Sequence, residues 1–153
     1  RERHGSCGST CHLARFRPAD AVVRARTRDA LTSRLAMPLI QIVSSAEPPA
    51  HDARARLLTT LSHLLAARFR KPERWVMTSL LPRAEMTFAG TTEPACYIEV
   101  KNIGTMSADD ARHVSADVTR VLTEAFGVRE DRIYIEFTDA TGYLWGHAGD
   151  TLA

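Results

Sequence analysis

From residue 39 onward, the hydrophobic positions form short β-rich runs that alternate with longer stretches of helical period. The run Leu39–Val43 is bounded by serine and proline, which predicts a buried strand. Leucines then recur at helical spacing as far as Phe69, which predicts a helix with its N-cap at Asp52. Pro72 is expected to end this helix, and the run Trp75–Leu81 predicts a second strand.

The same order of patterns occurs a second time. Tyr97–Ile103 predicts a strand, and Ser107 with Asp110 three residues later forms the signature of a capping box. The apolar face of the helix that follows consists of Val114, Val118, Val121, Leu122, Ala125 and Phe126. Gly127 is a natural residue just after a helix end, and Arg132–Phe137 predicts the last strand.

These repeated patterns predict an α+β fold made of two β-α-β units. Two helices would cover one face of a four-stranded mixed sheet, with a right-handed crossover in each unit. We expect the other face to be apolar as well, because two helices cannot hide all of the strand residues Ile40, Ile42, Val76, Ile98, Ile133 and Ile135. A sheet that is apolar on both faces needs a second covering layer, so the pattern predicts an oligomer that packs sheet against sheet.

Charge divides the chain into a basic leader, residues 1–36, and an acidic body, residues 37–153. The leader has eight arginines against three acidic residues, a net charge of +5, and the body has a net charge of −3. The acidic body argues against nucleic-acid binding, which needs clustered lysine and arginine. No apolar run approaches the roughly 18 residues that a membrane span needs.

The leader has two interpretations. An arginine-rich, acid-poor segment suits an organellar transit peptide. Alternatively, residues 1–36 are upstream sequence that does not belong to the mature protein, which the start at Arg1 instead of methionine favours.

The three cysteines do not indicate a disulfide framework. Cys7, Cys11 and His12 have no second ligand pair after them, so we expect no metal site there. Cys96 is expected to be a small buried apolar residue.

Several separated stretches of the body resemble the macrophage migration inhibitory factor family of the tautomerase superfamily. They read MPLIQIV, KPERWVMTSL, MTFAGTTEPACYIEVKNIGTMS and DRIYIEFTDA, and they occur in the family's order across residues 37–153. The resemblance implies a homotrimer of β-α-β-β-α-β subunits. It also implies that Met37 is removed, so that Pro38 becomes the first residue of the mature protein.

The chemistry of proline explains why this position would matter. A free N-terminal proline is an amine with a reference pKa of about 7.7–8.0, and an apolar pocket or a nearby cation lowers that pKa. It could then act as a neutral base near pH 7. Within a chain, Pro38 has an amide nitrogen, so the predicted catalyst requires that the leader and Met37 are absent. The structural alternative is a proline that enters an edge strand.

The resemblance also implies five further site residues. Lys71 would hold a substrate carboxylate and disfavour protonation of the proline, and Ile103 would contact substrate through its backbone. Tyr134 would come from the neighbouring subunit, and Trp75 would lie at the pocket rim. Glu136 stands where many animal members have asparagine, and its charge would favour a protonated proline unless it pairs with Lys71 across the interface. Each of these residues also has an ordinary packing or solvent-facing interpretation.

Three positions depart from the family pattern. Arg70 replaces a glycine that commonly precedes the lysine, which removes an easy left-handed helix cap. His147 and Leu152 occupy positions that are usually aromatic, which changes the expected wall of the pocket. Since only Cys96 is present where mammalian members have a Cys-x-x-Cys pair, thiol–disulfide exchange is not expected.

The sequence therefore predicts a phenylpyruvate-type keto–enol tautomerase that needs no metal or organic cofactor, with a small enol or keto acid as substrate. The alternative is a cytokine-like trimer of the same fold that binds a protein receptor and has a vestigial pocket. The expected location is the cytoplasm, with secretion without a signal peptide, or an organelle if the leader is a transit peptide, as alternatives.

Overall fold

The computed structural model describes residues 37–152. The predictions for the leader and for Cys7, Cys11 and His12 therefore lie outside the described residues. None of the helices in the described part is long and apolar enough to span a membrane.

The described chain consists of two β-α-β units followed by a short C-terminal hairpin. The first unit contains β1 (Pro38–Ser44), α2 (His51–Phe69), the 3₁₀ helix η1 (Glu73–Trp75) and β2 (Met77–Pro82). The second contains β3 (Cys96–Ile103), α3 (Ala108–Phe126), the 3₁₀ helix η2 (Glu130–Arg132) and β4 (Ile133–Ala140). The 3₁₀ helix η3 (Gly142–Leu144) leads to the hairpin of β5 (Gly146–His147) and β6 (Asp150–Thr151).

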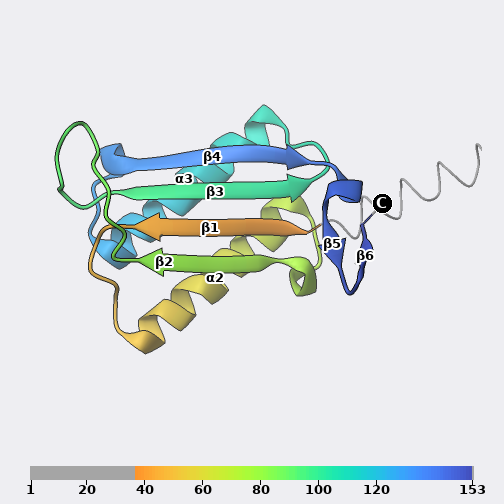
Figure 1. Ribbon diagram of the computed structural model, residues 1–153, viewed down its shortest axis with the longest axis horizontal. Helices are drawn as coiled ribbons and strands as arrows, with labels where there is room; N and C mark the ends of the chain where they lie inside the picture. The colour runs from red at the N-terminus through yellow and green to blue at the C-terminus, as the bar shows by residue number, and fades with distance from the viewer. Residues whose placement is uncertain (1–36, 153) are drawn as a thin grey trace, which may run out of the picture.

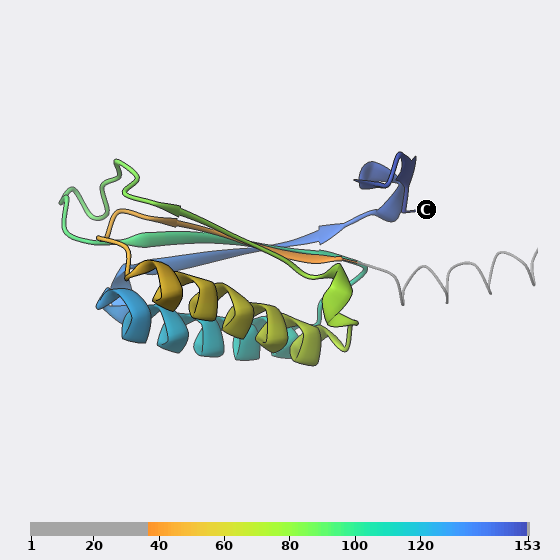
Figure 2. The same cartoon turned by 90° about the horizontal axis from the view of Figure 1, so that it is seen from below.

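The main sheet has the order β2-β1-β3-β4, and its central pair is antiparallel while each outer pair is parallel (Figure 1). Both helices lie on the same face, and the other face is bare in the described chain (Figure 2). This arrangement confirms the predicted α+β class and the mixed sheet with helices on one face.

The helix ends agree with local sequence signals in α3 but not in α2. Ser107 and Asp110 form the predicted capping box, and Gly127 ends α3 at a φ of 67°. The predicted N-cap of α2 is wrong, because Ala50 occupies that position without a side-chain cap and Asp52 lies in the first turn. A carboxylate in a first turn still interacts favourably with the helix dipole, which is why the sequence signal misleads by two residues.

Two predicted strand boundaries need correction. Trp75 belongs to the 3₁₀ helix η1, so β2 begins at Met77. Arg132 likewise ends the 3₁₀ helix η2, and β4 continues to Ala140. In both units a short helical turn redirects the chain before the strand, and β-rich composition alone does not reveal such a turn.

The hydrophobic core lies between the sheet and the two helices, and the prediction of an apolar uncovered face is wrong. Ile40, Ile42 and Ile98 are 0% exposed and Ile133 is 9% exposed. Val76 and Ile135 pack against the same cluster. The pairing of Ile42 with Ile98, and of Ile98 with Ile135, places these residues on the helix-covered side. Two helices therefore cover more of the sheet than the sequence argument allowed.

The uncovered face has a polar centre. The Tyr97 hydroxyl donates a hydrogen bond to Glu136 at 2.5 Å, and Lys101 forms an ion pair with Glu99 at 2.6 Å. The carboxylate of Glu136 raises the pKa of Tyr97 to about 12. The large apolar side chains exposed on this face lie toward its margins, at Met77, Leu81 and Tyr134.

Candidate active site

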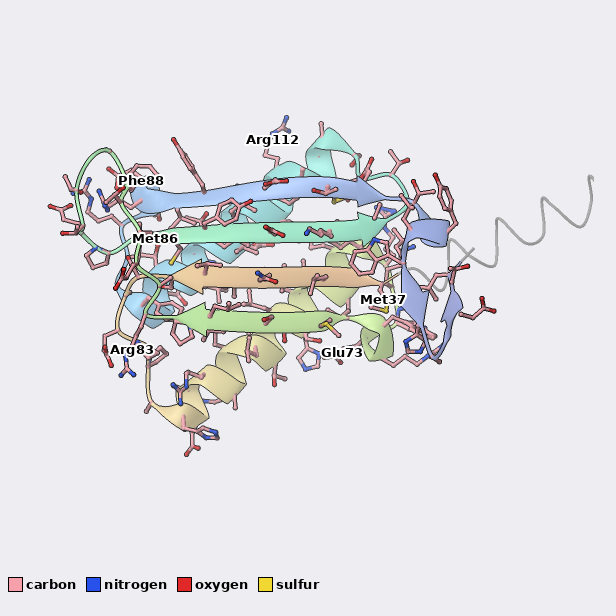
Figure 3. The ribbon with its side chains drawn as sticks, in the orientation of Figure 1. Met37, Glu73, Arg83, Met86, Phe88 and Arg112 are labelled. Atoms are coloured by element: carbon pink, nitrogen blue, oxygen red, sulfur yellow. The ribbon has the colours of Figure 1, made fainter. Side chains whose placement is uncertain are left out.

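Pro38 lies at the end of the sheet where β1 begins. It pairs directly with Asn102 near the end of β3, and its side chain is fully buried. Figure 3 labels Met37, which precedes it, at the end of the sheet from which the C-terminal hairpin extends. The pyrrolidine ring is therefore held in the fold by sheet pairing, and its nitrogen is an amide as long as Met37 is attached.

A pocket of about 200 Å³ opens at the same end of the sheet. It is lined by Arg68, Phe69, Arg70, Lys71, Asn102, Ile103, Gly104, Thr105 and Asp110. Lys71 reaches this place because the chain reverses sharply after α2. The C-cap residue Arg70 adopts a left-handed φ of 54°, and the backbone N–H of Lys71 then bonds to the carbonyl of Ala66 at 2.9 Å. The absence of glycine therefore does not prevent the left-handed cap.

Three cationic side chains and Asp110 line the pocket, and the two arginines among them pair with aspartates of α3. Arg68 contacts Asp117 at 2.6 Å, and Arg70 lies 3.6 Å from Asp110. Partial burial lowers the pKa of Lys71 below the usual lysine value. A lysine beside a buried proline can attract an anionic group and disfavour protonation of a neighbouring amine.

The C-terminal hairpin contacts the turn that follows Lys71. The rings of Trp75 and His147 meet edge to face, with their centroids 5.1 Å apart. The backbone N–H of Leu152 bonds to the carbonyl of Trp145 at 2.9 Å, which closes the hairpin. Trp75 is half-buried and His147 packs against it, and neither residue lines the 200 Å³ pocket.

Tyr134 and Glu136 do not lie with the other predicted site residues. Tyr134 pairs with Tyr97, which is five positions along β3 from the partner of Pro38. At about 3.4 Å per residue, this separation is roughly 17 Å along the sheet. Glu136 lies between these two ends, on the uncovered face. A site that uses both Pro38 and Tyr134 therefore needs two copies of the chain.

A second pocket, of about 350 Å³, lies beside Tyr134 at the opposite end of the sheet. Its lining includes Met86 and Phe88, which Figure 3 labels at the end of the sheet away from Met37. The rings of Phe88 and Tyr134 lie 4.8 Å apart. The buried side chain of Arg132 donates hydrogen bonds to the carbonyls of Glu93 and Pro94 at 2.8 and 2.9 Å, and it lies over the ring of Phe88.

Sequence reasoning missed Asn102, the pairing of Trp75 with His147, and the position of Phe88. A signal for Asn102 was present, because it follows Ile98 and Val100 at every second residue and so occupies an inward position of β3. The contacts of His147 and Phe88 had no local signal, since each depends on a partner distant in the chain.

Residues 37–152 contain no group of three or more histidine, cysteine, aspartate or glutamate side chains that could hold a metal ion. Cys96 is buried, as expected, and its thiol bonds to the Ser44 hydroxyl at 3.4 Å. Burial raises the pKa of this thiol, which opposes formation of a thiolate.

The mixed sheet with two helices on one face defines an α+β protein, and comparison with known proteins places it in the tautomerase superfamily. The family model described as macrophage migration inhibitory factor (MIF) matches residues 37–153. The chain belongs to this family.

Individual relatives agree with this assignment. A macrophage migration inhibitory factor homolog of Trichuris trichiura is 30% identical over 107 residues, which are 70% of this chain and 94% of the relative. The solved homologue from Prochlorococcus marinus is 44% identical, with a TM-score of 0.70 over 75% of this chain and 99% of that chain. The MIF-like protein mif-2 of Caenorhabditis elegans is 26% identical over 76% of this chain and 96% of the relative. The matched part is nearly the whole of each of these relatives.

Proposed function

We propose that this protein, once Pro38 is its first residue, is a keto–enol tautomerase of the phenylpyruvate type. The observation that supports the proposal is that Lys71 and Ile103 line one pocket at the end of the sheet together with Asn102, the residue that pairs with Pro38. Pro38, Lys71 and Ile103 come from three separate elements, and a base beside a carboxylate-binding cation is the arrangement that proton transfer in a keto acid requires.

In the proposed reaction, Lys71 binds the substrate carboxylate and neutral Pro38 removes a proton from the carbon next to the carbonyl. The C–H electrons form the carbon–carbon double bond of the enol, and protonated Pro38 gives the proton it has taken to the carbonyl oxygen, so that the neutral base is restored. The reverse direction returns the proton from Pro38 to carbon. No electrons leave the substrate, so the reaction needs no redox cofactor. The buried position of Pro38 and the charge of Lys71 both favour the neutral amine.

A homotrimer is part of the proposal, because Tyr134 is roughly 17 Å from the Pro38 end within one chain. The Tyr134 of a second copy would complete the pocket and stabilise charge that develops on the substrate oxygen. Sedimentation analysis of residues 37–153 should give a trimer, and Tyr134→Phe should lower kcat while the trimer persists. A stable, active monomer would contradict this part of the proposal.

The activity is tested on residues 37–153 after mass spectrometry has shown that Met37 is removed. Ketonisation of enolphenylpyruvate should be catalysed, and Pro38→Gly should lower kcat/KM by roughly 10²–10⁴-fold, as expected for loss of a general base. The same chain with residues 1–37 retained is the matched control and should be inactive. Unchanged turnover in Pro38→Gly would exclude this mechanism.

The paired rings of Trp75 and His147 are proposed to influence the choice of substrate. His147 presents a polar ring where the family pattern is aromatic, so His147→Trp should increase the preference for phenylpyruvate over pyruvate. Equal kcat/KM ratios in the two proteins would show that His147 does not contact substrate.

A second candidate function is recognition of a protein receptor by the trimer, with a vestigial pocket. The departures at His147 and Leu152 favour this candidate. An electrophile that modifies the N-terminal proline separates the two functions, because it should abolish turnover and leave binding through the trimer surface intact.

A further inference from the structure

Asn102 carries a buried oxygen that lacks a hydrogen-bond partner. The residue is 4% exposed, and its Oδ1 atom has no partner among the described residues. The inward positions before it on β3, Cys96, Ile98 and Val100, are all buried and apolar or weakly polar. A buried carbonyl oxygen without a donor is costly, so an unsatisfied group of this kind requires an explanation.

The position of Asn102 relates it directly to the proposed base. Asn102 pairs with Pro38 across the antiparallel ladder, and both side chains lie on the helix-covered face. Directly opposite residues of such a pair have their Cβ atoms about 4.5–5.5 Å apart. Asn102 also lines the 200 Å³ pocket together with Lys71 and Ile103.

The acidic groups near Asn102 already have partners. Asp110 caps α3 and lies near Arg70, and Asp139, which pairs with Asn102 on β4, accepts the backbone N–H of Met106 at 2.9 Å. The charged groups that face the pocket from α2 and the turn after it are Arg68, Arg70 and Lys71, and all are cationic. Asn102 Oδ1 is thus a neutral acceptor beside Pro38 that no described contact uses.

The donor that matches this oxygen does not exist while Met37 is attached, because the nitrogen of an internal proline carries no hydrogen. Removal of Met37 creates a secondary amine with one N–H when neutral and two when protonated. We propose that Asn102 Oδ1 accepts a hydrogen bond from the N–H of mature Pro38 and thereby directs its lone pair into the pocket. Asn102 is then a positioning residue for the base, and the inference rests on the proposed release of Pro38.

This hydrogen bond also adjusts the basicity of Pro38. A protonated amine donates more strongly than a neutral one, so Asn102 stabilises the charged form while burial and Lys71 oppose it. The two influences keep the amine close to the working pH, where a proton can be both taken up and returned.

The test is a titration of the Pro38 nitrogen by ¹⁵N NMR in mature protein labelled with ¹⁵N-proline. Asn102→Leu keeps the approximate shape and removes the acceptor, so the proline pKa should fall by about one unit. Asn102→Asp keeps an acceptor and adds negative charge, so the pKa should rise. No shift in Asn102→Leu, or a shift of the same sign in both variants, would overturn the proposal.

A stability comparison separates the proposed contact from a general packing role. In the protein that retains residues 1–37, Asn102→Leu should leave the urea midpoint unchanged or raise it, because it removes an unsatisfied group. In the mature protein the same variant should lower the midpoint. Equal changes in the two forms would show that Asn102 acts without Pro38. If Asn102→Leu fails to fold in either form, the comparison is made with Asn102→Asp, which should stabilise the mature form relative to the longer one.

Turnover is measured separately on enolphenylpyruvate. If Asn102→Leu shifts the proline titration but the mature protein shows no turnover, the contact is upheld and the tautomerase proposal is rejected. If the mature protein shows turnover but Asn102→Leu leaves the titration unshifted, the tautomerase proposal is upheld and the contact is rejected. A selective rise in KM with an unshifted titration would show that Asn102 binds substrate instead and would overturn the positioning role.

Discussion

The two β-α-β units have the same order of elements, but the turns between the helix and the second strand differ. The first turn presents a side chain to a pocket, and the second buries one in the core. Both helices have 19 residues, both end in a left-handed residue, and both are followed by a three-residue 3₁₀ helix. After α2, the turn presents the half-buried Lys71 to the pocket, and after α3 the turn places Val128 in the core at 1% exposure. The first turn thus borders the candidate site at one end of the sheet, whereas the second turn is packed into the core at the other end.

The same contrast holds for the arginine of each turn. Arg74 is exposed and lies over the ring of Trp75, whereas Arg132 is buried and binds carbonyls of the loop that contains Phe88. The comparison teaches that the first unit carries backbone strain next to the site, because α2 ends in Arg70 at a left-handed φ of 54° where α3 ends in glycine. The helix starts also differ, since α2 has no side-chain N-cap, at the end of the sheet away from the pocket, and α3 has a full capping box.

The largest loss of stability is expected when the residue after the C-cap of α3, Val128, is replaced by lysine, the residue found at the equivalent position after α2. Val128→Lys places an ammonium group in the core without a partner, so it should lower the free energy of unfolding by roughly 4 kcal/mol, close to complete unfolding. Urea denaturation of residues 37–153 measures this. Val128→Ala should cost only about 2 kcal/mol, and equal losses in the two variants would mean that the second turn is as open as the first.

The two arginines should differ almost as strongly. Arg132→Met leaves the carbonyls of Glu93 and Pro94 without their donor, so it should lower the free energy of unfolding by about 3 kcal/mol. The matched variant Arg74→Met should change it by less than about 0.5 kcal/mol, because Arg74 is exposed. Thermal and urea unfolding of both variants measure the two losses. Equal losses of unfolding free energy would show that the two arginines contribute alike.

Lys71→Val is the converse substitution, because it places the residue found after α3 at the equivalent position after α2. Stability should be retained, and kcat/KM should fall by roughly 10–100-fold, mainly through KM, because the charged partner of the substrate carboxylate is lost. Since burial lowers the pKa of Lys71, the wild-type KM should rise at alkaline pH earlier than for an ordinary lysine. Lys71 is charged below that pKa and neutral above it.

Lys71→Arg is the control for this pH dependence. A guanidinium stays charged over the accessible range, so the alkaline rise in KM should disappear. A rise that persists unchanged in Lys71→Arg would assign it to another group.

Substitutions at the two helix starts should change stability in opposite directions. Ser107→Ala removes the capping box of α3 and should destabilise the protein by about 1 kcal/mol, whereas Ala50→Ser adds a cap to α2 and should stabilise it by about 0.5 kcal/mol. Thermal unfolding resolves both signs. A loss of stability in Ala50→Ser would show that a contact of the native alanine matters more than the cap.

Arg70→Gly should have the smallest effect. Glycine removes the strain of the left-handed φ but adds freedom to the unfolded chain, so a net gain of about 0.5 kcal/mol is expected. Arg70→Asn, which tolerates this conformation, should be close to neutral. If KM for the keto acid doubles in Arg70→Gly while stability rises, the strain positions Lys71.

The sequence predicted the second unit better than the first. The capping box and Gly127 are local signals, and both are found where the pattern placed them. The pattern predicted that α2 reaches Phe69, but the left-handed conformation of Arg70 after it could not be predicted, because no local rule favours arginine in that conformation. For the site, the resemblance predicted Pro38, Lys71 and Ile103, which the structure places at one end, but no local pattern identified Asn102 as their neighbour.

By itself, the sequence determined the order of elements, the α+β class and the family, because hydrophobic period and turn residues act over short distances. The tertiary structure decided which face of each strand is covered, since strand register sets that for the whole sheet at once. It also decided that Tyr134 is far from Pro38 within one chain and that Asn102 lies opposite Pro38. Distances between elements depend on packing and pairing of segments far apart in the chain, and no local pattern contains them.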